Sequence, residues 1–194
     1  QIDSLNLINN VNLTTLYCQS NNLNYLNIDN CLLLYFLSCG DNQLSSLNLS
    51  DNLNLSTLAC PNNNITSLDL IHNTNLTLLV AYNNQLQDVD LRNGNNTNMG
   101  ASLNNLNLTN NSQLSCVSVD SISWSVAYWT YSSGNIDPWT YFSVDCNPLY
   151  GCTNSMATNY DPLATVDNGS CMYSCGGITG VNLTDVIQDR ATFN

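Results

Sequence analysis

The sequence predicts an all-β solenoid with a parallel sheet and a C-terminal cap, followed by a short disulfide-bounded module and the start of a β-sandwich. Three observations carry this prediction. Apolar and Asn positions repeat every 21 residues over the first half of the chain. Asp is the only acid and Lys is absent, so the residues that cover exposed helix faces are missing. The repeat stops after Leu114, where an open solenoid end needs a cover.

We divide the chain into four parts, namely repeats at 1–120, a cap at 121–146, a Cys-bounded linker module at 147–174 and opening strands of a truncated sandwich domain at 175–194. Leu5 and Leu7 fit an incomplete coil, so we expect the array to begin upstream of Gln1.

The repeat holds its register in several columns. Two Leu columns comprise Leu13, Leu34, Leu55 and Leu76, and Leu16, Leu37, Leu58 and Leu79. A third column contains Cys18, Cys39, Cys60 and Ala81, and a fourth contains Asn21, Asn42, Asn63 and Asn84. An Asn/Leu-biased low-complexity segment would not keep such a register, so we interpret the columns as stacked structural units.

Each unit alternates apolar and polar residues around its second Leu, which predicts a short strand with Leu16 and Cys18 pointing inward. Stacking pairs these strands into a parallel sheet. The Asn column follows the strand, and its side-chain amides can satisfy backbone groups that the turn leaves unpaired. A second apolar pair, such as Leu26 and Ile28, forms the back wall. No unit buries its apolar face alone, so stability comes from neighbouring coils.

Each unit reads L-x-x-L-x-C-x-x-N-x-L-x-x-L-x-[LI], which is the leucine-rich-repeat signature. Cys in the strand resembles the 21-residue repeats of internalin J-type surface proteins. The chain also resembles secreted repeat proteins of marine Bacteroidetes, because L-R-N-G-N-N-T-N (91–98) leads through a shortened coil into L-S-C-V-S-V-D (114–120), like their closing coil. We expect 116–120 to be the last strand.

The segment after the repeats contains Trp124, Trp129 and Trp139 without a period, and we interpret it as the cap. We expect Cys116 and Cys146 to form a disulfide across it. The alternative role for the three Trp is a platform for carbohydrate.

Residues 151–171 resemble a short Cys-bounded module of secreted marine bacterial proteins, G-C-T…A-x-N-Y-x-P-x-A-x-x-D-x-G-S-C, which looks like a spacer. Cys152 and Cys171 bracket it and are expected to pair. Residues 175–194 resemble the opening of a fibronectin type III-like domain. Two disulfides indicate an oxidising, extracellular setting.

The other cysteines are expected to be unpaired within this chain. Cys18, Cys39 and Cys60 lie one coil apart, and we predict reduced, buried thiols that pack as small apolar groups. A straight row of three thiols does not make the tetrahedral site that zinc prefers. We leave Cys31 free, and Cys175 has no clear partner.

The formal charge of −12, with only two Arg, excludes nucleic acid as a partner and excludes an anionic membrane surface. No apolar run is long enough to span a membrane, so we expect no membrane insertion.

We predict no enzymatic activity, because nothing places the single His, His72, beside a nucleophile. Asp88 and Asp90 are expected on the solvent side of the back wall rather than as a glycosidase pair. We predict no cofactor apart from one candidate, calcium, whose oxygen ligands would be Asn159, Asp161, Asp167 and Asn168. Local turns of Asn and Asp side chains are the alternative for these four residues.

The candidate binding site is the solvent-facing side of the concave sheet. It presents uncharged columns that include apolar and aromatic side chains, and we select Tyr17, Phe36, Leu78, Val80 and Tyr82. The alternative is a passive β-surface.

We therefore expect an extracellular adhesion or partner-binding scaffold of a larger secreted or cell-surface protein, with a protein or glycan at a cell surface as partner. The Bacteroidetes resemblance implies export by the type IX secretion machinery, with a sorting domain beyond Asn194. A passive stalk or fibre-forming spacer, and the non-catalytic part of a secreted hydrolase, are the alternatives.

Overall fold

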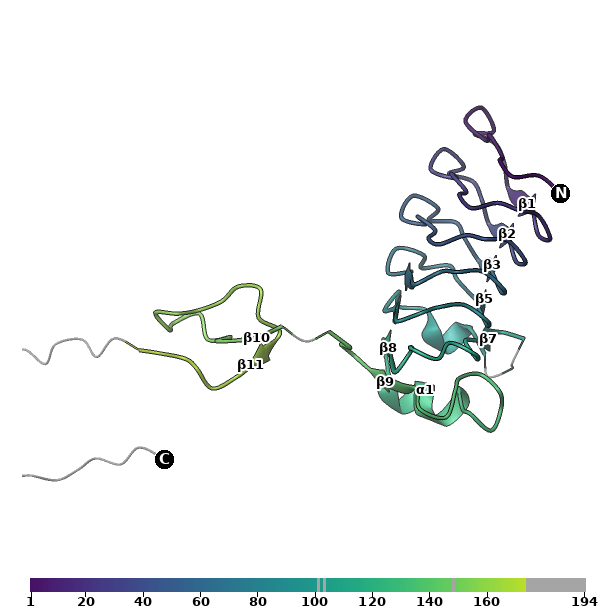
Figure 1. Cartoon of the computed structure of the whole chain (residues 1–194). Coiled ribbons are helices and arrows are strands. Elements are labelled where there is room, and N and C mark those ends of the chain that lie inside the picture. Colours follow the sequence, from purple (N-terminus) through teal and green to yellow (C-terminus); the bar gives the residue numbers. More distant parts are fainter. Residues whose placement is uncertain (101, 103, 148, 174–194) are drawn as a thin grey trace, which may run out of the picture. The chain divides into compact units, whose positions relative to one another are not determined.

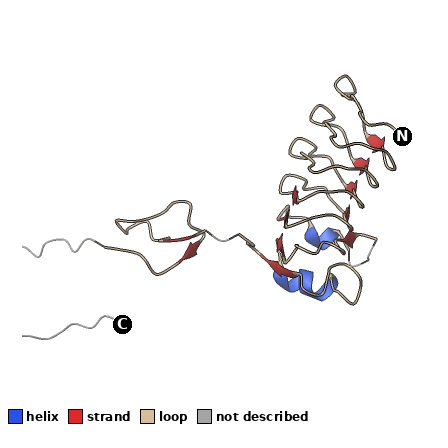
Figure 2. Ribbon diagram, in the orientation of Figure 1, coloured by secondary structure: helices blue, strands red, loops and turns tan. Residues whose placement is uncertain are grey.

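In the computed structural model, the described residues are 1–100, 102, 104–147 and 149–173. The chain forms two compact units, Gln1–Cys146 and Asn147–Asn194. The first unit is a stack of coils in Figure 1, with short strands repeated from coil to coil, and Figure 2 shows how little helix it contains. Fourteen Asp and no Glu or Lys leave few residues that favour helix, so the predicted all-β solenoid is confirmed.

The front sheet consists of five parallel strands in the order β1-β2-β3-β5-β7. Their bounds are β1 Thr15–Tyr17, β2 Phe36–Ser38, β3 Thr57–Ala59, β5 Leu78–Val80 and β7 Leu106–Asn107. The first four strands pair in the 21-residue register of the sequence, so Leu16 lies beside Leu37 and Leu37 beside Leu58. This is the sheet that the repeat predicts, and the candidate binding site was expected on its solvent-facing side.

The back sheet has the order β4-β6-β8-β9 and is also parallel. Its strands are β4 Ser67–Asp69, β6 Asp88–Leu91, β8 Cys116–Val119 and β9 Tyr141–Ser143. The core lies between the two sheets, where the Leu columns are almost completely excluded from solvent except at Leu13, which is partly buried. Leu26 and Ile28 are buried in the back wall, as expected.

Two expectations about the end of the array were wrong. The coil after β6 is longer than the others, since Leu106 pairs with Leu79 although 27 residues separate them. The extra length contains the 3-10 turn Asn96–Asn98 and the buried Met99. The strand that includes Cys116 is not the last one, because β9 pairs beyond it in the back sheet.

The cap contains one short helix, α1 Ile122–Tyr128, whose first turn is capped by the hydroxyl of Ser121. Trp129 follows α1 and is almost completely buried, with its indole N–H donating to the carbonyl of Gly100. Trp124 packs edge-on against Trp129, with 4.9 Å between ring centroids. Trp139 differs from the other two because half of its surface is exposed.

The second unit, as far as it is described, is small. β10 Tyr150–Gly151 pairs in parallel with β11 Val166–Asp167. Ala157 and the Cys152 side chain are among its few buried groups. The stretch expected to open a fibronectin-like domain, and Cys175 within it, lie outside the described residues.

Candidate functional site

The Asn column forms a continuous hydrogen-bonded ladder through the first unit. The Asn42 amide donates to the carbonyls of Cys18 and Cys39, at 3.0 and 3.1 Å, and its oxygen accepts the N–H of Leu23 at 3.0 Å. Asn63 and Asn84 repeat this pattern one and two coils later. Asn21 begins the ladder, with its oxygen accepting the N–H of Ile2. Each amide therefore ties two adjacent coils together.

Sequence reasoning missed the last two members of this ladder. Asn111 donates to the carbonyls of Ala81 and Leu108 and accepts the N–H of Leu86. Asp137 of the cap then accepts the backbone N–H groups of Asn110 and Asn111, at 3.1 and 3.0 Å. Asn111 lies 27 residues after Asn84, so the longer coil removed it from the 21-residue column.

The ladder and the Leu columns connect the coils behind the front sheet, and the outer side of this sheet carries residues selected as a candidate binding site. Four of them stand in the expected columns, since Thr15, Phe36, Thr57 and Leu78 are in register, as are Tyr17, Ser38, Ala59 and Val80. The fifth, Tyr82, lies two residues after β5. Tyr17 is the most exposed, at 63%, and the other four are half-buried. The rings of Tyr17 and Phe36 pack with centroids 4.7 Å apart.

A third column, just after the strands, comprises Gln19, Gly40, Pro61 and Tyr82. None of these three columns contains a charged residue. In the third column, a Cβ at Gly40 would come within 2.9 Å of the Pro61 ring, so Gly and Pro fit together closely there. The side chains that remain are hydroxyls, an amide, aromatic rings and aliphatic groups. Such a surface suits a partner that needs no charge compensation.

A second apolar surface runs along the turns that precede the front strands, and the sequence analysis did not select it. Val11, Leu32 and Leu53 lie 21 residues apart and are each slightly more than half exposed. Their spacing in the sequence was a signal that could have identified them. They stand beside the front sheet, because Tyr35 and Phe36 follow Leu32 within four residues.

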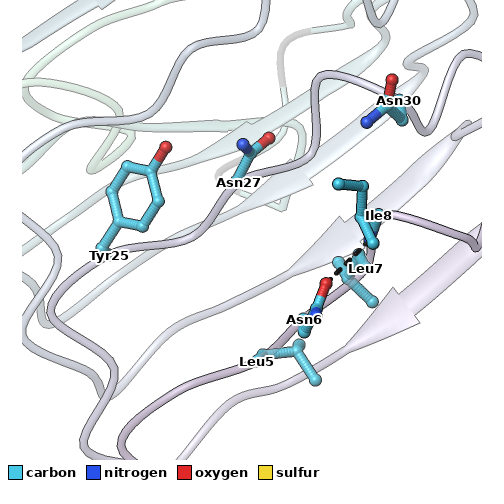
Figure 3. Close-up of a pocket in the computed structure, with 7 residues that line it drawn as sticks. All are labelled: Leu5, Asn6, Leu7, Ile8, Tyr25, Asn27 and Asn30. Atoms are coloured by element: carbon cyan, nitrogen blue, oxygen red, sulfur yellow. Dashed lines mark hydrogen bonds between the residues drawn. The ribbon is translucent and has the colours of Figure 1, made fainter.

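A pocket of about 230 Å³ lies at the N-terminal end of the array, and its walls include Leu5, Ile8, Tyr25 and Asn27. Figure 3 shows these side chains between the first two coils. None of them belongs to the front sheet, so this pocket is separate from the five selected residues.

The Cys column consists of free, buried thiols at Cys18, Cys39 and Cys60, and Cys31 is also free and buried. Burial raises the pKa of Cys18 to about 11 and that of Cys60 to about 12. Burial, together with the neighbouring thiols, raises the pKa of Cys39 well above its ordinary value. These thiols are therefore protonated at neutral pH and pack as apolar groups. Among the described residues, no three His, Cys or Asp side chains gather in a way that could hold a metal ion.

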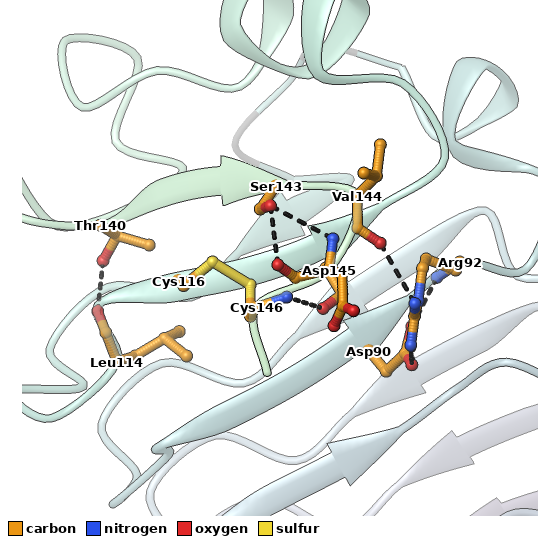
Figure 4. The surroundings of a disulfide bond; sticks show 10 residues. Asp90, Arg92, Leu114, Cys116, Thr140, Ser143, Val144, Asp145 and Cys146 are labelled. Atoms are coloured by element: carbon orange, nitrogen blue, oxygen red, sulfur yellow. Dashed lines mark hydrogen bonds and ion pairs between the residues drawn. A yellow bond between two sulfur atoms is a disulfide. The ribbon is translucent and has the colours of Figure 1, made fainter. Parts of the chain in front are cut away.

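Both expected disulfides are present, between Cys116 and Cys146 and between Cys152 and Cys171. The first joins β8 to the segment after β9 (Figure 4). Beside it, Arg92 forms an ion pair of 2.6 Å with Asp90 and donates to the carbonyl of Val144. Partial burial opposes ionisation of Asp90, but hydrogen bonds from Arg92 and its charge lower the pKa of Asp90 overall.

The residues considered for catalysis do not form a constellation. His72 is exposed in a turn, and the carbonyl of His72 accepts the N–H of Thr74. Asp88 and Asp90 lie on the outer side of β6, with Val89 and Leu91 pointing inward. Asp90 forms an ion pair with Arg92, the only Arg or Lys among the described residues.

The four candidate calcium ligands lie in the loops of the second unit. One oxygen of each accepts a backbone N–H: Asn159 from Met172, Asp161 from Leu163, Asp167 from Gly169 and Asn168 from Ser170. Three of these are bonds to the residue two positions ahead, which is the local turn geometry expected as the alternative. Calcium binding stays a prediction.

The chain is similar to known proteins in structure but not in overall sequence. No family model matches the chain, and no curated protein matches it. A solved structure described as the functional domain of InlJ from Listeria monocytogenes, which includes a cysteine ladder, shares 22% identity with a TM-score of 0.49. The match covers 73% of this chain and 32% of that one, so this chain spans about a third of the length of its neighbour.

The fold is a leucine-rich-repeat solenoid. This assignment rests on features of this chain, namely its repeat signature, its in-register parallel strands and its Asn ladder. No helix among the described residues is long and apolar enough to cross a membrane.

Proposed function

We propose that this protein is a non-enzymatic, extracellular scaffold that binds a protein partner through the outer side of its front sheet. The observation that carries the proposal is the charge-free front sheet on a chain of net charge −12. Elsewhere the surface is rich in Asp and Asn, whereas this sheet presents a ring pair on β1 and β2, and Leu78, Val80 and Tyr82 on or just after β5. Aromatic anchors on a rigid surface are typical of residues that dominate binding energy.

The extracellular location is part of the proposal. Two disulfides favour an oxidising compartment. We also propose that the protein is exported by the type IX machinery and attached to a cell surface. This part of the proposal is supported by the resemblance to secreted Bacteroidetes proteins.

The test compares two tyrosines that are equally exposed on different faces. Tyr17 lies on the front sheet at 63% exposure, and Tyr25 lies outside it at 64%. The purified chain is screened against surface proteins, glycans and whole cells, and binders are titrated against Tyr17→Asp, Phe36→Asp and Tyr25→Asp. We expect Tyr17→Asp and Phe36→Asp to weaken protein binding by roughly thirtyfold or more, with Tyr25→Asp close to wild type.

The outcomes separate the candidate functions. Binding to glycans alone, with the same dependence on Tyr17 and Phe36, would keep the site and replace the partner class. Equal loss in all three variants would reject the front sheet as the site. A folded protein that binds nothing would support the second candidate, a passive stalk or spacer, which the tandem arrangement of two units favours.

A further inference from the structure

The chain contains two Asn-Gly dipeptides, and the structure gives them nearly the same local geometry in different surroundings. They are Asn93-Gly94, at the end of β6, and Asn168-Gly169, after β11. In this dipeptide the backbone nitrogen of Gly can attack the side-chain carbonyl carbon of Asn, because Gly has no Cβ to hinder the approach. Asn is for this reason a chemically labile residue.

In Asn168-Gly169, the attacking Gly169 nitrogen lies beside an acid, and the Asn168 side-chain oxygen lies beside a hydrogen-bond donor. The N–H of Gly169 donates to a carboxylate oxygen of Asp167 at 2.9 Å. The side-chain oxygen of Asn168 accepts the N–H of Ser170 at 3.0 Å. The carboxylate is therefore in position to accept the proton of the attacking nitrogen. The Ser170 N–H is in position to stabilise negative charge that develops on the Asn168 oxygen.

In the other dipeptide Asn93 is buried and Gly94 is exposed, and the same two contacts are present. Gly94 donates to Asp120 at 3.0 Å, and the oxygen of Asn93 accepts the N–H of Asn95 at 3.0 Å. Its leaving group is held, however, because the Asn93 amide nitrogen donates to the carbonyl of Asn73 in the core. Asn93 is 5% exposed, whereas Asn168 is exposed and its amide nitrogen makes no hydrogen bond within the described residues.

We propose that Asn168 is a site of spontaneous, intramolecular deamidation, with Asp167 as the proton acceptor, and that burial protects Asn93 from the same reaction. The Gly169 nitrogen forms a bond to Cγ of Asn168, its proton passes to Asp167, and the Cγ–Nδ2 bond breaks. Nδ2 leaves as ammonia after protonation by water. Water then opens the resulting five-membered succinimide at either carbonyl, which leaves an aspartyl or an isoaspartyl linkage at position 168.

The modification would change the second unit. Position 168 directly follows β11, and its N–H donates to the carbonyl of Gly151 in β10 at 3.1 Å. An isoaspartyl linkage adds one carbon to the main chain at this point, three residues before Cys171 of the disulfide. It also adds a negative charge beside Asp167. The product is therefore a second unit with an altered loop and one more carboxylate.

The test incubates the full, disulfide-intact chain at mildly alkaline pH and follows both dipeptides by peptide mass spectrometry in the same sample. We expect conversion at Asn168, with both aspartyl and isoaspartyl products, and no conversion at Asn93. After reduction and denaturation, we expect Asn93 and Asn168 to deamidate at similar rates. Such a result would show that the difference in the folded chain comes from its structure. Equal rates at the two sites in the folded chain, or a stable Asn168, would overturn the proposal.

The role of Asp167 has its own variant. Asp167→Asn keeps an oxygen that can accept the Gly169 N–H but removes the base. We expect slower conversion at Asn168 in the folded chain and an unchanged rate in the denatured chain. An unchanged rate in the folded variant would remove Asp167 from the mechanism.

Discussion

At the scale of single residues, the solenoid depends on side chains that satisfy the backbone of a neighbouring coil. Asn63 accepts the N–H of Leu44 and donates to two carbonyls, all in the core. Asn63→Ala would leave these groups buried and unpaired, at about 1–3 kcal/mol for each group that finds no substitute. We expect the free energy of unfolding in urea to fall by at least ~2 kcal/mol. Asn24→Ala, at an exposed position, is the control and should change it little.

The cysteine column gives a prediction about pH. Folding raises the pKa of Cys60 from 9.0 to about 12 because the thiol is buried. Below pH 9 the thiol is protonated in both states, so its contribution to stability is complete. Between pH 9 and 12 the unfolded thiol ionises first, and stability falls. Cys60→Ala, which copies Ala81 of the next coil, should make the unfolding free energy less dependent on pH in this range. Identical pH profiles would contradict the prediction.

The residue scale is also where sequence reasoning worked best. The column of Asn42, Asn63 and Asn84 could be predicted, because in every coil the same turn leaves an N–H and carbonyl groups unpaired. The Asn side-chain amide forms hydrogen bonds with them each time. The strand positions of Tyr17, Phe36, Leu78 and Val80 follow the period for the same reason. Their function in binding remains a prediction, because exposure and chemistry do not identify a partner.

At the scale of elements, the cap replaces the coil that would follow the last repeat. Asp137 accepts the N–H groups of Asn110 and Asn111, which in earlier coils bond to backbone carbonyls of the next coil. Asp137→Ala should therefore lower stability by roughly 1–3 kcal/mol. Asp51→Ala, which removes an exposed acid from a turn of the repeats, is the comparison for the loss of a carboxylate. If the two variants are equally stable, the cap does not depend on this contact.

The cap is also where prediction from sequence was least successful. Its extent could be inferred from the end of the repeat, but α1 and β9 could not, because neither has a column to compare with. β7 was missed for a different reason. Six additional residues before Leu106 moved it out of the 21-residue register, although its packing against Leu79 is unchanged.

At the scale of the whole molecule, charge is the dominant property. The chain has a formal charge of −12, and Arg92 is the only Arg or Lys among the described residues. Repulsion between acids opposes the compact state, and salt screens it with a Debye length of ~10 Å at 0.1 M and ~3 Å at 1 M. We expect thermal stability to rise with NaCl. An equally concentrated neutral sugar serves as the comparison, since it stabilises by exclusion and does not screen charge. A melting temperature that is independent of NaCl would contradict this prediction.

The long coil between β6 and β7 has a consequence for how such a molecule can change over evolution. Its additional length includes the buried Met99, and the contact of Asn111 with Ala81 is the same as in coils of ordinary length. The connection from back strand to front strand therefore tolerates insertions, whereas the segment from the front strand to its Asn does not vary in length in any coil. Insertions that form new loops are therefore expected in the connection from back strand to front strand. Changes elsewhere in the array are expected to add or remove one complete coil at a time.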